Sequence, residues 1–156
     1  MIKPALLYAL WAATAGALIP VMAAMNGRLG KTIGNAPYSV LALFIIAIAG
    51  AAIYVFVSKA PLPSLTLIAK APPIYFTGGL IVLFYVISVT ILTPQFGVAN
   101  TIFFVVVAQI VSATVIDHFG LFGVDIRTLG LKRTLGILML IAGVILARAA
   151  PASGEG

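Results

Sequence analysis

The side chains that could do chemistry are few, and the most unusual is an amide inside a long apolar run. Gln109 lies in the stretch from Gly97 to Gly123, which also carries the adjacent acid and imidazole Asp117 and His118. A polar side chain in hydrocarbon needs a partner or a wet cavity, because its bare burial costs on the order of several kcal/mol. If the protein handles a solute, we therefore expect this segment to form one wall of the path.

Gln109 allows two interpretations. Ser112 follows three residues later, on nearly the same face of a helix, and the pair could contact a solute. Alternatively, Gln109 makes an interhelical hydrogen bond worth about 0.6 kcal/mol, which holds a helix bundle together. The sequence leaves both open.

Asp117 and His118 also allow two interpretations, a gate or proton relay and a solvated pair at the water interface. We expect the second, because the pair ends the apolar run. One Asp and one His are too few for a metal site, so no metal or cofactor is expected. No apolar run has an acid in its middle, and no nucleophile, base and orienting group come together, so an enzyme is not expected.

Composition places the chain in the membrane. Of its 156 residues 63% are hydrophobic and 8% are charged, whereas a soluble domain carries roughly 25% charged residues. Mean hydropathy is +1.24. The net charge of +6 does not indicate nucleic-acid binding, because the cations lie at the ends of apolar runs without forming a basic stripe.

Five apolar runs are long enough for membrane helices, which need roughly 20 residues. We predict an all-α integral membrane protein with one five-helix domain, 1–150, and a disordered tail, 151–156. Short turns are predicted after Asn26 and at the segment TPQFG, which contains Pro94. The predicted spans are about 4–26, 37–57, 74–92, 98–116 and 134–149.

Five spans would place the two termini on opposite sides of the cell membrane. Lys and Arg concentrate on the cytoplasmic side of membrane proteins, and six such residues share the predicted side of the N-terminus against three on the other. We therefore expect a cytoplasmic N-terminus, while the small bias leaves a mixed orientation open. The six are Lys3, Lys59, Lys70, Arg127, Lys132 and Arg133, and the three are Arg28, Lys31 and Arg148.

The first run contains candidates for a hinge and for a cavity wall. Pro20 cannot donate a backbone hydrogen bond, and with Gly16 one turn earlier it predicts a bend that serves packing or frees a carbonyl. Asn26 is predicted to end the helix as a cap, or to border a cavity mouth. Trp11 and Tyr85 lie deeper than interface anchors usually do, and could line the cavity.

The last run carries Gly136 and Gly143 at helical spacing. Small residues let helix backbones approach closely in lipid, so we predict a helix–helix contact there.

Several motifs resemble the YdcZ-like branch of the drug/metabolite transporter superfamily. The most specific is the string DHFGLFG, from Asp117 to Gly123, with Gln109 upstream. The segments 26–30, 34–37, 78–79 and 94–99 also match. The resemblance implies a five-helix unit like half of a ten-helix transporter built from inverted repeats. Such a half needs an inverted partner, either a second copy or a paralogue.

Two function classes remain open. The first is a small secondary transporter that moves an unidentified small solute through a site between two inverted protomers. The second is a membrane scaffold or regulatory subunit that transports nothing, which the missing embedded acid favours.

Overall fold

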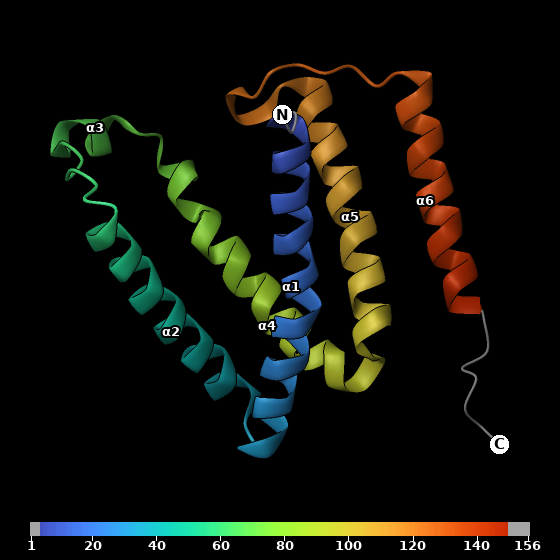
Figure 1. Ribbon diagram of the computed structural model, residues 1–156, viewed down its shortest axis with the longest axis horizontal. Coiled ribbons are helices and arrows are strands. Elements are labelled where there is room, and N and C mark those ends of the chain that lie inside the picture. The colour runs from blue at the N-terminus through green and yellow to red at the C-terminus, as the bar shows by residue number, and fades with distance from the viewer. Residues whose placement is uncertain (1–3, 150–156) are drawn as a thin grey trace. The chain divides into compact units, whose positions relative to one another are not determined.

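The computed structural model describes residues 4–149, so the predicted tail 151–156 lies outside the described residues. Within that range the chain forms six α-helices and two short 3₁₀ helices, without a strand (Figure 1). The elements are α1 Pro4–Thr32, α2 Ala36–Val57, α3 Leu65–Lys70, η1 Pro73–Thr77, α4 Gly78–Phe96, α5 Val98–Phe119, η2 Leu121–Gly123 and α6 Leu131–Ala149. The predicted all-α class is confirmed.

Four segments of the described chain are long and apolar enough to cross a membrane, namely Pro4–Thr32, Ala36–Val57, Pro73–Phe96 and Val98–Phe119. Helix α6 is not among them. Its 19 residues include Lys132 and Arg133 in the first turn and Arg148 near the end. A multi-pass membrane protein is therefore supported, while the fifth span stays a prediction.

The chain divides into two compact units, Met1–Val98 and Ala99–Gly156. We call them the N-terminal and C-terminal units and describe each by itself. The N-terminal unit contains α1, α2, α3, η1 and α4, and the C-terminal unit contains α5, η2 and α6.

The helix end predicted at Asn26 is wrong. Helix α1 continues through the segment that looks like a turn and ends at Thr32. The reason lies in packing: a Cβ on Gly27 would stand 3.0 Å from Cγ of Pro94, and one on Gly30 would stand 3.1 Å from Cα of Ala36. These glycines permit close helix contacts, which outweigh their poor helix propensity.

The turn predicted at TPQFG is also shorter than expected. Helix α4 runs through Pro94 to Phe96, and Gly97 alone separates it from α5. Gly97 has φ of 87°, a backbone conformation that glycine adopts without strain. Pro94 lies in the last turn of α4, where its ring packs against Gly27 of α1.

In the N-terminal unit, α1 meets both α2 and α4 near its C-terminal end, and α2 leans away from α1 toward the opposite end (Figure 1). The residues at this meeting point form what we call the junction: Asn26, Gly27, Gly30, Lys31, Ala36, Ser39, Thr90 and Pro94. A three-residue connection, 33–35, joins α1 to α2 beside it. The best-packed part of this unit is therefore the end at which α1, α2 and α4 meet.

In the C-terminal unit, α5 ends in a tight reversal. Gly120 adopts a left-handed conformation with φ of 61°, directly after the last residue of α5. The chain then turns back along the end of α5, because the backbone N–H of Arg127 donates to the carbonyl of Asp117 at 2.8 Å. This connection brings the start of α6 close to Asp117, near the end of α5.

Candidate functional site

The strongest polar contact in the N-terminal unit joins α1 to α4. Nδ2 of Asn26 donates to Oγ1 of Thr90 at 2.5 Å, and both side chains are buried. Asn26 is therefore neither a helix cap nor an end residue, which corrects the sequence-based expectation. In a membrane an amide gains from such a partner because hydrocarbon offers none. Sequence reasoning did not single out Thr90, although a threonine inside an apolar span is the kind of signal that could have found it.

Replacing Thr90 with valine tests this bond. The substitution keeps the side-chain shape and leaves the buried amide of Asn26 without its acceptor, so we expect a loss of about 1 kcal/mol in unfolding free energy. Reversible unfolding in mixed micelles would measure it. Thr14→Val on α1 is the matched control, because Oγ1 of Thr14 is exposed and bonds only within its own helix. Equal effects of the two substitutions would contradict an interhelical role for Thr90.

An open hollow of about 300 Å³ lies beside the junction. Nζ of Lys31, on α1, donates to the carbonyl of Pro94, on α4, at 3.3 Å. Apart from Ile91, the remaining wall is made of glycines, small side chains and amides. The lining residues are Gly27, Gly30, Lys31, Gly34, Asn35, Ala36, Thr90, Ile91, Pro94 and Gln95.

The other predicted site residues of this unit are dispersed. Trp11 is 78% exposed on α1. Tyr85 is half-buried, and its enclosed hydroxyl has no hydrogen-bond partner among the described residues. Gly16 has no heavy atom within 4 Å of a Cβ position, and α1 continues past Pro20 without interruption. A hinge at Gly16 and Pro20 stays a prediction.

Gln109 and Ser112 lie together on α5, and both side chains are exposed. Within the described part of the C-terminal unit, the side chain of Gln109 makes no hydrogen bond, and an interhelical bond to a helix outside that unit stays a prediction. Trp11 and Tyr85 belong to the other unit. A cavity shared by all four residues therefore stays a prediction.

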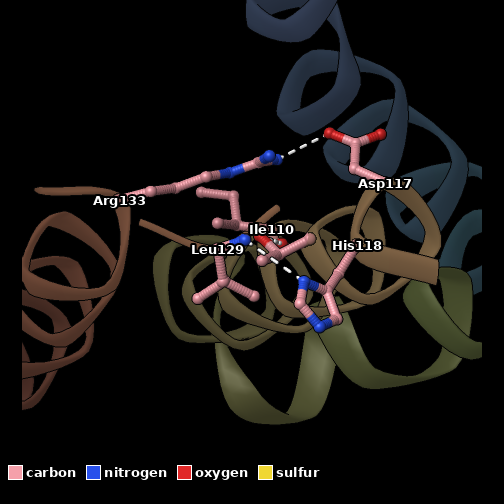
Figure 2. Close-up of polar contacts among 6 residues, drawn as sticks. Ile110, Asp117, His118, Leu129 and Arg133 are labelled. Atoms are coloured by element: carbon pink, nitrogen blue, oxygen red, sulfur yellow. Dashed lines mark hydrogen bonds and ion pairs between the residues drawn. The ribbon is translucent and has the colours of Figure 1, made fainter. Parts of the chain in front are cut away.

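Asp117 pairs with a cation sixteen residues later (Figure 2). The guanidinium of Arg133, in the first turn of α6, lies 2.7 Å from Oδ2 of Asp117, and the two side chains are 37% and 32% exposed. The acid lies near the end of α5, and its place at the water interface stays a prediction. It is held by an ion pair, however, and is not simply solvated, which corrects that part of the expectation.

His118 faces a different partner from its neighbour. The backbone N–H of Leu129 donates to Nδ1 of His118 at 3.1 Å (Figure 2). The ring also makes an edge contact with Phe119, with centroids 4.8 Å apart. The side chain of Asp117 thus binds the first turn of α6 and His118 binds the connection before it, and no bond between the two side chains forms a relay.

The Asp117–Arg133 pair can be tested by a double-mutant cycle. Both groups are about one-third exposed, so solvent screens the pair and its contribution should be at most about 1 kcal/mol. We expect Asp117→Asn and Arg133→Gln each to lower thermal stability slightly, and the double variant to be no worse than either single one. Fully additive losses would show that the two side chains act independently.

A shallow groove of about 400 Å³ runs between α5 and α6. Its wall includes Thr114, Arg133 and Gly136. A Cβ on Gly136 or Gly143 would meet no heavy atom within 4 Å. The close helix contact predicted for these glycines is therefore not made within the C-terminal unit as far as it is described, and it stays a prediction.

The comparison with family models identifies the chain's relatives. A model described as "Putative inner membrane exporter, YdcZ" matches residues 7–146. The chain belongs to the YdcZ family.

The match to the YdcZ family includes nearly all of the described residues, from α1 through most of α6. The junction, the exposed face of Gln109 and the Asp117–Arg133 pair all lie inside it. No curated protein and no solved structure matches the chain. Membership of the YdcZ family supports a membrane transport role of the exporter type.

Proposed function

We propose that the chain is one half of a small secondary transporter of the drug/metabolite type. It moves a small solute along a path between two protomers inserted in opposite orientations, and it makes or breaks no covalent bond. The observation that carries the proposal is Gln109: an exposed amide in the middle of an apolar span, inside a family of membrane exporters. Such a side chain needs a polar partner, and the described residues of the C-terminal unit do not supply one.

The exposed surface of the helices supports a second protomer. In the four candidate spans, only 0% to 17% of the most apolar window is buried. Lipid covers part of such a surface, but lipid offers no hydrogen bond to Gln109. A partner helix or a solute between protomers satisfies the amide.

We propose that α6 is the fifth span. Its 19 residues extend about 28 Å at 1.5 Å per residue, close to the roughly 30 Å of a hydrocarbon core. Its cations come near the two ends of its sequence, and its middle is apolar. An odd number of spans places the termini on opposite sides, so two inverted copies give alternating access by symmetry.

A scaffold or regulatory subunit is the second candidate. It is favoured by one observation: no candidate span of the described chain has a carboxylate in its interior, and Asp117 is committed to Arg133. Proton-coupled exchange commonly uses an embedded acid that binds proton and substrate in turn.

Reconstitution separates the two candidates. The purified protein in liposomes would be screened for counterflow of labelled organic cations, amino acids, nucleosides and sugars. The proposal expects saturable exchange of at least one class above the level of empty liposomes. Absence of exchange in every class, together with stable co-purification of a larger membrane protein, would support the scaffold and contradict the transporter.

A further inference from the structure

Two hollows of the N-terminal unit adjoin one another. The polar hollow at the junction shares Ala36 and Ile91 with an apolar groove of about 250 Å³ between α2 and α4. The groove is lined by Ala36, Pro37, Val40, Leu41, Phe44, Leu83, Ile87 and Ile91. We call the two hollows together the junction groove, with the polar hollow as its mouth and the apolar groove as its body.

The mouth of the junction groove carries positive charge without a matching acid. Lys31 donates to the carbonyl of Pro94, which occupies one of the three N–H donors of its ammonium group. No Asp or Glu precedes Asp117 in the sequence, so the N-terminal unit contains no carboxylate that could neutralise Lys31. The N-terminus of α2 at the same mouth has no side-chain cap.

The body of the junction groove has the dimensions of half a bilayer. It extends along α2 from Ala36 to Phe44, which is about 12 Å at 1.5 Å per residue. One leaflet contributes about half of the roughly 30 Å hydrocarbon core. The mouth lies beside the short connection between two candidate spans, and a connection between successive spans is expected at the membrane surface.

We propose that the junction groove binds an anionic phospholipid. The phosphate head contacts Lys31 at the mouth, and one acyl chain lies between α2 and α4. The charge, the apolar lining and the length each match a different part of that molecule. This inference does not depend on the proposed transport function, because a bound lipid would fill the space between helices in a transporter and in a scaffold alike.

Fluorescence quenching by brominated lipid tests the site. Trp11 is the only tryptophan of the chain, so Trp11→Phe provides a silent background. Phe44→Trp then reports from inside the groove, and Phe56→Trp, 84% exposed on the same helix, reports from outside it. Quenching by brominated phosphatidylglycerol and by brominated phosphatidylcholine is compared at the same low mole fraction in phosphatidylcholine vesicles.

The groove reporter should be quenched several-fold more strongly by the anionic lipid, and the outside reporter nearly equally by both. Lys31→Gln should lower the preference about fivefold, and Lys31→Arg should retain it. Arg28→Gln removes the same charge from the same helix end, but Arg28 does not line the groove, so its effect should be less than half as large.

Equal quenching of the groove reporter by both lipids would overturn the proposal. So would equal losses in Lys31→Gln and Arg28→Gln, which would indicate diffuse attraction to the surface. Absence of quenching by either lipid would show that a protein segment fills the groove and would also overturn it. If Lys31→Gln fails to fold, the proposal is decided by the preference of the groove reporter for the anionic lipid in the protein that retains Lys31.

Discussion

Gly30→Val is expected to destabilise the N-terminal unit more than any other single change considered. A Cβ at this position would stand 3.1 Å from Cα of Ala36 and 3.1 Å from Oγ of Ser39. The Cα of Ala36 belongs to the backbone, and the side chain of Ser39 is fully buried, so neither atom can move aside easily. The two further methyl groups of valine add to the crowding, and we expect a loss of about 3 kcal/mol.

The measurement is reversible unfolding in mixed micelles, with Gly50→Val as the control. Gly50 is also a helix-interior glycine, but no heavy atom lies within 4 Å of a Cβ there, so its replacement should change the free energy by less than about 0.5 kcal/mol. If the Gly30 variant matches the Gly50 variant, the close contact between α1 and α2 is not what stabilises this unit.

Gln109→Met is expected to lower solute exchange at least about tenfold without loss of folding. Methionine keeps the length and flexibility of the side chain and removes its hydrogen-bonding groups. Loss of one such contact to a bound solute costs about 1–3 kcal/mol, and 1.4 kcal/mol corresponds to a factor of ten. Exchange by reconstituted protein is the readout, with the solute class found in the reconstitution screen.

Val106→Ala is the matched control for this prediction. Val106 is exposed one turn earlier on α5, so its truncation alters a nearby surface of the helix without removing a polar group. The control should retain exchange. If Gln109→Met retains exchange as well but loses the dimer in crosslinking, the amide serves as an interhelical contact and not as a solute ligand.

The class of the protein followed from its hydropathy, because long apolar runs in a chain with few charges have few alternatives to membrane helices. The ends of the helices could not be predicted from hydropathy. Local propensity made Asn26, Gly27 and Gly30 look like a turn, whereas contacts with Thr90, Pro94 and Ala36 continue the helix. Those partners are distant in sequence, and no local pattern specifies them.

The candidate site was predictable in part. The amide of Gln109 was identified because a polar group in an apolar run is conspicuous in any context. The partner of Asp117 was not, because the Arg133 contact depends on the path of the connection after Gly120. The glycines of α6 and the side chain of Gln109 show a further limit, since neither finds a partner within the described part of the C-terminal unit and the sequence does not name one elsewhere.

The central claim is that the functional unit contains two protomers of opposite orientation. The chain has no cysteine, so one introduced cysteine gives a unique label. Ile33→Cys and Ala60→Cys place that label in exposed connections before and after α2, and therefore on opposite sides of the membrane in any one molecule. Intact cells would be labelled with an impermeant maleimide, and then lysed and labelled with a maleimide of different mass.

Crosslinking the protomers in the membrane with an amine-reactive reagent and weighing the dimers gives the decisive measurement. The proposal predicts that each dimer carries one maleimide of each mass, for Ile33→Cys and for Ala60→Cys alike. If the inverted partner is a paralogue, the chain instead carries one label throughout and is crosslinked to a second, related chain. Dimers of this chain alone in which both protomers carry the same label would contradict the account.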